Sequence, residues 1–188
     1  TLLSVTREEL VDTEIVPVTK LIPLTKSQNA LPSIAAFVNG KIVVGDLALE
    51  ADWNLQIRSA KRRITDNAPI IEITDGNLNK RNLIATVDLR DVVVEILRYV
   101  LESALSAGFD LTTFPVRFGC PANWNGEQRR MLLECAEEAG FLNANIDDLR
   151  DEPIAAGLQF IDALNLNKQE HYGQVLVFDM GGGTLDVA

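Results

Sequence analysis

Short apolar runs broken by proline and polar residues fill the chain from residue 14 to residue 45. Runs of this kind predict β-strands, and the prolines favour strand ends or sheet edges because proline cannot donate to a strand ladder. Ile34 to Val38 and Lys41 to Val44 flank Asn39-Gly40, two residues that accept a positive φ at low cost. The pattern therefore predicts a hairpin at this turn. Residues 5–11 combine strand and polar features, and their structure stays open.

After this hairpin, the apolar residues recur at the spacing of a helix. The pattern is helical and basic from Asp46 to Arg63, whereas residues 66–82 are polar and indicate a hairpin or a loop. A long amphipathic helix is predicted at about residues 89–107, with Asp88 as its N-cap and Gly108 at its end. Its apolar stripe is predicted to consist of Val93, Ile96, Leu97, Val100, Leu101, Ala104 and Leu105.

Strands and helices alternate after this helix. Phe114 to Phe118 and Ile146 to Leu149 are predicted to be short strands. Between them, Asn125 is placed to cap a helix and to form a capping box with Gln128, and Gly140 is placed to end that helix. The buried face of the helix is predicted to be Leu132, Cys135, Ala136 and Ala139.

The last part of the chain continues the alternation. A helix is predicted to open at Asp151-Glu152-Pro153, because proline is tolerated in the first turn, where its missing N–H does no harm. Val175 to Phe178 is a continuous apolar run of the kind found in strands buried on both faces. The order of elements, β-rich first and then alternating, implies an α/β fold.

Composition and charge narrow the classes of partner. The hydrophobic fraction of 47% is enough for a packed core. The formal charge of −10, from 27 acidic and 17 basic side chains, repels a phosphate backbone at long range, so nucleic acid is not an expected partner. The sequence contains no apolar stretch long enough to span a bilayer, and a membrane is not an expected partner.

Cysteine and histidine usage argues against a zinc site and against a Ser–His–Asp triad. Cys120 and Cys135 are the two cysteines, His171 is the one histidine, and these residues do not cluster along the sequence. Both cysteines are interpreted as buried apolar groups in a reducing compartment, which places the protein in the cytoplasm.

The most informative segment is V-L-V-F-D-M-G-G-G-T-L-D-V, residues 175–187. A buried strand leads to Asp179, and three consecutive glycines follow, which let backbone N–H groups approach an anion closely. Asp179 and Asp186 flank the glycines and can hold a hydrated divalent cation. The residues predicted to bind phosphate are Gly181, Gly182, Gly183 and Thr184. The alternative is a tight hairpin turn between two strands, which accounts for one or two glycines.

Five segments resemble, in order, motifs of the seventy-kilodalton heat-shock chaperones of the DnaK type. The segments are L-P-S-I (31–34), A-K-R-R-I (60–64), C-P-A-N-W-N-G-E-Q-R-R (120–130), D-E-P-I-A-A-G-L (151–158) and V-F-D-M-G-G-G-T-L-D-V (177–187). Together they cover most of the chain and are much more specific than any one of them.

The resemblance implies a role for particular residues. Lys61 would be the catalytic lysine that reaches the γ-phosphate and the attacking water, and Glu152 would position that water or the hydrated metal. Asp179 would lie closest to the Mg²⁺ and K⁺ ions, with Thr184 beside the γ-phosphate and Asp186 as a further ligand. Pro121 and Arg129 would belong to the relay that, in the family, reports the nucleotide state to the substrate domain.

Each of three implied roles has a structural alternative. Lys61 stands among several arginines, and a basic cluster is usually a solvated helix face. Glu152 before Pro153 can simply be a carboxylate that stabilises a helix N-terminus. Pro121 can merely end a strand.

The resemblance also implies the architecture. The chain would be the first lobe of an actin-like (ribonuclease-H-like) ATPase with a small α+β inserted subdomain. Residues 1–33 and 87–173 would form the core subdomain, residues 34–86 the insertion, and residues 174–188 the start of a second, truncated lobe. The cofactors would be ATP or ADP with Mg²⁺ and K⁺.

Some positions depart from the family pattern and mark the chain as divergent. Thr65 stands where a glycine is usual, and Asn123-Trp124 replaces Tyr-Phe. Ile154 replaces a threonine, Gly157 an alanine and Leu185 a phenylalanine. The segment between Lys61 and Pro121 is also shorter than in typical members of the family. These departures make a chaperone role less secure than the nucleotide chemistry.

The family's first phosphate loop, of the D-L-G-T-T-N-S kind, and its adenosine motif do not occur in the chain. Phosphoryl transfer needs several groups converging on one phosphate. We therefore expect this chain alone to bind ATP weakly, to hold no tightly bound cofactor and to show no turnover. We also expect the strand at residues 175–188 to pair with a second copy or fold back irregularly.

The functional expectation is an ATPase whose turnover gates peptide binding in the full-length protein, with unfolded peptides and cochaperones as partners. Two alternatives stay open: a small-molecule kinase of the sugar-kinase kind on the same fold, and a regulatory or filament-forming protein that binds nucleotide.

Overall fold

The computed structural model describes residues 1–11, 14–26, 29–77, 80–142, 144–166, 173–180 and 185–187. These residues form a mixed α/β fold with five small sheets, which confirms the α/β class at this level. The strands are β1 (Leu3–Val11), β2 (Glu14–Ile22), β3 (Ile34–Val38), β4 (Lys41–Val44), β5 (Gln56–Arg58), β6 (Ile70–Thr74), β7 (Leu83–Asp88), β8 (Phe118–Cys120), β9 (Leu149–Asp151), β10 (Phe178–Met180) and β11 (Leu185–Val187). The α-helices are α1 (Asp46–Glu50), α2 (Ala60–Thr65), α3 (Leu89–Ser106), α4 (Gly126–Ala139) and α5 (Glu152–Leu166).

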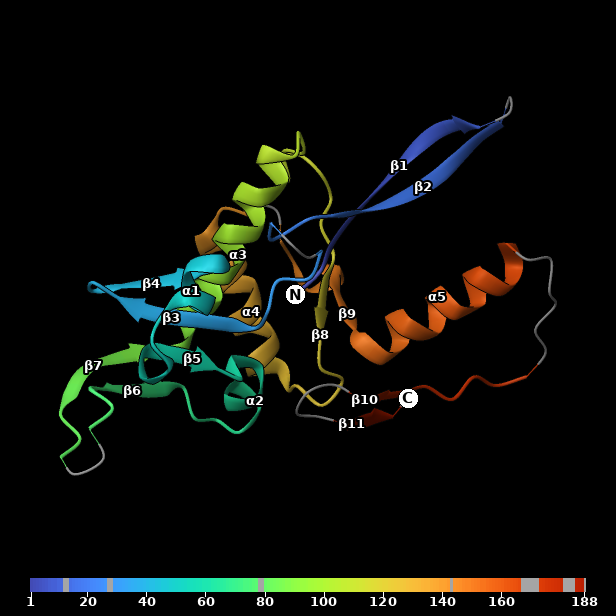
Figure 1. Ribbon diagram of the computed structural model, residues 1–188. Coiled ribbons are helices and arrows are strands. Elements are labelled where there is room, and N and C mark those ends of the chain that lie inside the picture. The colour runs from blue at the N-terminus through green and yellow to red at the C-terminus, as the bar shows by residue number, and fades with distance from the viewer. Residues whose placement is uncertain are drawn as a thin grey trace.

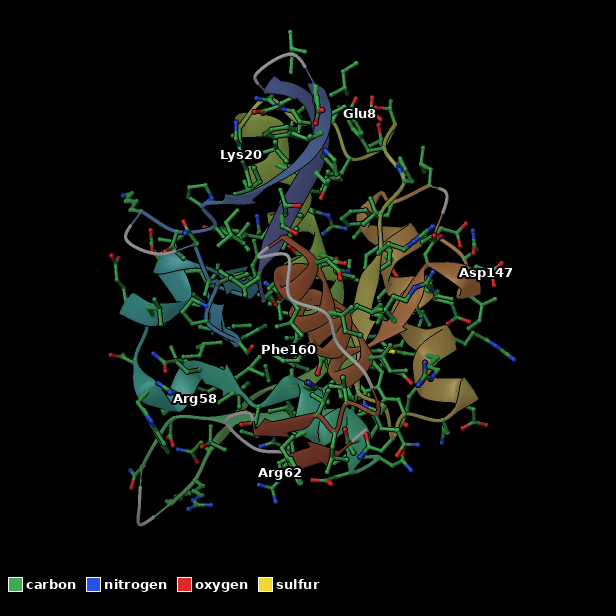
Figure 2. The ribbon with its side chains drawn as sticks, turned by 90° about the vertical axis from the view of Figure 1, so that its right-hand side faces the viewer. Glu8, Lys20, Arg58, Arg62, Asp147 and Phe160 are labelled. Carbon is green, nitrogen blue, oxygen red and sulfur yellow. The ribbon has the colours of Figure 1, made fainter. Side chains whose placement is uncertain are left out.

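Strands β1 and β2 form a long antiparallel hairpin that projects from the body of the molecule (Figure 1). Its register runs from the Leu3–Ile22 pair to the Val11–Glu14 pair. The segment at residues 5–11, which the sequence left open, is therefore a strand. Figure 2 shows Glu8 and Lys20 on this hairpin, at the far end of the molecule from Arg58 and Arg62.

The hairpin predicted at Asn39-Gly40 is confirmed. Asn39 has φ 51° and Gly40 has φ 79°, the two positive values that a tight I′ turn requires. Strands β3 and β4 pair across this turn, and β5 pairs with the other edge of β3. Strand β5 and a short 3₁₀ turn interrupt the helical segment that the sequence predicted from Asp46 to Arg63, leaving the two short helices α1 and α2.

Strands β6 and β7 form the hairpin that was one of the two interpretations of residues 66–82. Helix α3 follows directly, with both predicted ends: the Asp88 side chain accepts a hydrogen bond from the Arg90 N–H at 2.9 Å, and Gly108 adopts φ 89°. The predicted stripe is wrong for Leu105, which is 62% exposed. Because α3 packs against α4 and also against β4 and β7, its buried arc is wider and rotated. The buried residues of α3 are Leu89, Val92, Val94, Val100 and Ala104.

Helix α4 has the predicted capping box. The Asn125 carboxamide oxygen accepts from the Gln128 N–H at 3.0 Å, and the Gln128 side chain accepts from the Asn125 N–H at 3.0 Å. Gly140 ends the helix with φ 114°, in the left-handed region. The predicted buried face is confirmed at Leu132, Cys135, Ala136 and Ala139.

The two short strands beside α4 lie later in the chain than predicted. Strand β8 begins at Phe118, because Pro115 has no N–H and only the residues that face β9 are paired. Before β9, the Asn145 and Asp148 side chains cap a 3₁₀ turn at Ile146–Asp148, which displaces the strand to Leu149–Asp151. Strands β8 and β9 are parallel, with Phe118 opposite Leu149 and Cys120 opposite Asp151.

Helix α5 begins at Glu152, as predicted, and extends to one side of the molecule, with residues 173–177 and β10–β11 beneath it (Figure 1). Figure 2 shows Phe160 on this helix, and its side chain is half exposed. The predicted strand at Val175 to Phe178 begins instead at Phe178, since only the residues opposite β11 are paired. None of the helices in the described part of the chain is long and apolar enough to cross a membrane.

Candidate functional site

Lys61 and Glu152 form an ion pair between two segments that are 91 residues apart in the sequence. The Lys61 ammonium donates a hydrogen bond to Oε2 of Glu152. Lys61 is the second residue of α2, and Glu152 is the first residue of α5, where a carboxylate also stabilises the helix N-terminus. The fold thus brings together two of the residues that the family resemblance implied as catalytic, Lys61 and Glu152.

The arginines near Lys61 are exposed, as a solvated basic face would be, but their contacts differ from that of the lysine. Arg62 extends to Asp66 on its own helix at 3.6 Å, and Arg58 donates to the Gln56 side chain. Lys61 points instead toward the start of α5. Its side chain keeps 41% of its surface exposed, so its positive charge can still reach an anion.

A cavity of about 440 Å³ opens beside the ion pair. Lys61, Glu152, Pro121 and Trp124 line one part of it, and apolar side chains of α3 line another. A charged pair at the edge of an apolar-walled cavity is a suitable place for a polar ligand group, because nearby low-dielectric walls strengthen the field of the charges.

Pro121 and Arg129 lie on either side of the loop that connects β8 to α4. Pro121 is fully buried. The Arg129 guanidinium donates to the Asp151 carboxylate at 2.6 Å, to the Trp124 carbonyl at 3.0 Å and to the Ala122 carbonyl at 3.4 Å. Arg129 therefore ties this loop to the end of β9, one residue before Glu152.

The glycine-rich segment lies in the sequence between two strands that pair with each other. Strands β10 and β11 pair antiparallel, with Asp179 opposite Asp186. The predicted phosphate-binding residues Gly181, Gly182, Gly183 and Thr184, and the side chains of both aspartates, lie outside the described residues. Among the described side chains there is no cluster of three or more His, Cys, Asp or Glu residues that could hold a metal ion.

Sequence reasoning did not single out Asp151, Thr65 or Trp124 as site residues. Asp151 is the acceptor for Arg129, and its signal was its place next to Glu152 in the D-E-P motif. The indole N–H of Trp124 donates to the Thr65 hydroxyl at 2.9 Å. The sequence pointed to Thr65 and Trp124 only in that both depart from the family pattern.

Both cysteines are buried free thiols, which agrees with their interpretation as apolar groups. Burial raises the pKa of Cys120 from its usual value and raises the pKa of Cys135 to about 11. Since the thiolate is the reactive form, burial and a raised pKa both make a cysteine inert.

We expect neither cysteine to react with a thiol reagent such as Ellman's reagent in the native protein at pH 8, and both to react after unfolding in guanidinium. A raised pKa in the folded state also means that the folded state loses stability as the pH rises from about 9 toward 11. Titration of the absorbance of released thionitrobenzoate checks the labelling. Fast native labelling of one thiol would contradict its burial.

Comparison with known proteins identifies the lineage of the chain. The family model described as Hsp70 protein matches residues 17–188. The chain is also similar to the chaperone protein DnaK of Mycoplasma mycoides subsp. mycoides SC, with 30% identity over 167 residues, which covers 87% of this chain and 25% of that protein. The chain thus spans about a quarter of the length of this relative. Both the family model and the relative cover the segments that contribute Lys61, Glu152 and Arg129, and the chain belongs to the Hsp70 family.

Proposed function

We propose that this chain carries part of the ATP-binding and ATP-hydrolysing domain of a DnaK-like chaperone, in which ATP turnover gates the binding of unfolded peptides. The observation that carries the proposal is the Lys61–Glu152 ion pair at the edge of the cavity. It joins two of the segments that resemble family motifs, and it leaves the lysine side chain 41% exposed where it lines the cavity.

In this proposal Lys61 stabilises negative charge on the γ-phosphate, and Glu152 accepts a hydrogen bond from the attacking water and orients it. Phosphoryl transfer depends mainly on such positioning and electrostatic stabilisation. The Gly181, Gly182 and Gly183 amides and the Thr184 hydroxyl would bind phosphate oxygens. Asp179 and Asp186 have the carboxylate chemistry that Mg²⁺ prefers, with K⁺ as a further ion, and the metal would neutralise phosphate charge.

The proposed architecture is the first lobe of an actin-like ATPase. Residues 1–33 and 87–173 would form its core, residues 34–86 a small inserted subdomain, and residues 174–188 the start of a second lobe. The mixed α/β fold supports this division, as does the placement of the β4–β3–β5 sheet within the proposed insertion. The β6–β7 sheet lies mostly within it, and β7 extends two residues past the boundary. The two buried free thiols support a cytoplasmic location.

Pro121 and Arg129 would transmit the nucleotide state to a peptide-binding domain. The contacts of Arg129 support this role, because they connect the loop after β8 to the residue that precedes Glu152. Unfolded peptides and cochaperones would be the partners of the full-length protein. Residues 175–188 would pair with a second copy or fold back irregularly when the rest of the second lobe is lacking.

The test is ATP hydrolysis by the full-length protein and by this 188-residue chain, measured as released phosphate with and without an unfolded peptide. We expect turnover by the full-length protein that the peptide accelerates, and no turnover by the shorter chain. Phosphate transfer from ATP to a sugar, or an absence of nucleotide binding in the full-length protein, would reject the proposal.

A further inference from the structure

Thr65 and Trp124 are two positions at which the chain departs from the family pattern, and the fold brings them into direct contact. The indole Nε1–H of Trp124 donates a hydrogen bond to the Thr65 hydroxyl oxygen at 2.9 Å, across 59 residues of sequence. The usual residues at these positions, glycine and phenylalanine, have no side-chain group that could form this bond. The two departures therefore belong together as a pair.

The Thr65 hydroxyl continues the connection to Lys61. Its Oγ1 donates to the Lys61 backbone carbonyl at 3.1 Å, one helical turn earlier. A hydroxyl group has one hydrogen and two lone pairs, so it can accept from Trp124 and donate to Lys61 at the same time. A continuous chain of hydrogen bonds thus runs from the indole to the backbone of the residue whose side chain pairs with Glu152.

Helix α2 needs such support because it is short. It has six residues, and Ser59 at its N-cap adopts φ 59° and makes no capping hydrogen bond with its side chain. An isolated helix of this length is marginal in water, so its position depends on tertiary contacts. Helix α2 packs against α3, and the start of α4 and the loop before it add hydrogen bonds. The Gln128 side chain donates to the Ile64 carbonyl at 2.9 Å, and the indole of Trp124 donates to the Thr65 hydroxyl.

The same loop also positions the other half of the ion pair. Arg129 bonds both to the Trp124 carbonyl and to the Asp151 carboxylate, which precedes Glu152. Trp124 is 8% exposed and lines the cavity next to Lys61. A shift of its indole would therefore change the position of Lys61 relative to Glu152.

We propose that Trp124 and Thr65 are positioning residues for Lys61, acting as a brace that fixes α2 relative to Glu152 and takes the place of the usual glycine and phenylalanine. The brace itself depends only on the contacts above. Its effect on turnover rests on the proposed function.

The kinetic test uses the full-length protein with T65V, which keeps the side-chain shape and removes the hydroxyl, and with W124F, T65S and the T65V/W124F double variant. Loss of one hydrogen bond corresponds to about a five- to tenfold change in rate. We expect T65V and W124F each to lower kcat by about that factor with little change in the KM for ATP. T65S should retain the wild-type rate, and the double variant should be no slower than the slower single variant, because both changes break the same bond.

A second readout separates this inference from the proposed function. The chain has two tryptophans, and Trp53 is 77% exposed, so solvent exchange of the two indole N–H groups can be compared by NMR and assigned with W53F. We expect the Trp124 indole N–H to exchange much more slowly than that of Trp53. T65V should accelerate its exchange severalfold, whereas T65S should not.

The outcomes decide between the two proposals. If the full-length protein does not hydrolyse ATP, the proposed function fails, and the brace is judged by indole exchange alone. If T65V leaves the exchange of the Trp124 indole unchanged, the brace is rejected. It is also rejected if the kinetic effects of T65V and W124F multiply in the double variant, or if T65S is as slow as T65V.

Discussion

Replacing Lys61 with alanine is expected to lower the kcat for ATP hydrolysis by the full-length protein at least about a hundredfold. The loss of one preorganised group that stabilises transition-state charge typically has an effect of this order. The fold pairs the Lys61 ammonium with Glu152 at the edge of the cavity. Measurement of phosphate release under saturating ATP gives kcat directly.

The same substitution should have little effect on stability. Both side chains of the Lys61–Glu152 pair are about one-third or more exposed, at 41% and 32%, and ion pairs at such positions contribute about 0–1 kcal/mol. A lower rate with an unchanged melting temperature therefore separates a catalytic role from a folding defect. Arg63→Ala on the same helix is the matched control and should retain the wild-type rate. Turnover by K61A within a few fold of wild type would remove Lys61 from the catalytic machinery.

Arg129→Ala is expected to be the most destabilising of the charge-removing changes proposed for this chain. The Arg129 side chain is 22% exposed and bonds to one carboxylate and two backbone carbonyls. Hydrogen bonds to charged groups contribute about 1.5–3 kcal/mol each, and partial exposure of this pair lowers its contribution. We expect a loss of about 2 kcal/mol in the free energy of unfolding, which corresponds to about 4–8 °C in the melting temperature for a chain of this size.

Arg130→Ala is the matched control, since Arg130 is the adjacent residue and its side chain is exposed. Its effect on the free energy of unfolding should stay within about 0.5 kcal/mol, as for most surface positions. Guanidinium unfolding followed by tryptophan fluorescence measures both variants. In the full-length protein, R129A should also weaken the acceleration of turnover by an unfolded peptide. Equal stability of the two variants would show that the Arg129 contacts do not hold the loop after β8.

Local features of the fold could be predicted from the sequence because a few adjacent residues determine them. The Asn39-Gly40 turn needs two residues that accept positive φ, and the capping box at Asn125 and Gln128 needs only three intervening peptide units. The start of α5 at Glu152 depends on the following proline in the same way. Each of these predictions is confirmed. None of the three features needs a partner that is distant in the sequence.

Short strands could not be placed in this way. Strands β8 and β9 have three residues each, and their boundaries are set by which residues face each other across the parallel pair. The stripe predicted for α3 failed at Leu105 for a related reason, because the buried arc of a helix depends on how many elements pack on it. Such information lies in the partner elements and not in the periodicity of the segment itself.

The sequence by itself identified the candidate residues for phosphate and metal chemistry: a lysine, a glutamate, and a glycine-rich segment between two aspartates. It also contained the motifs of the family in their order. Only the tertiary structure decided that Lys61 contacts Glu152, and that the unusual Thr65 and Trp124 are hydrogen-bonded to each other. The physical reason is that a charge or a hydroxyl acts over a few ångströms. Which groups come that close is fixed by the packing of α2, α4 and α5, and not by any pattern within one segment.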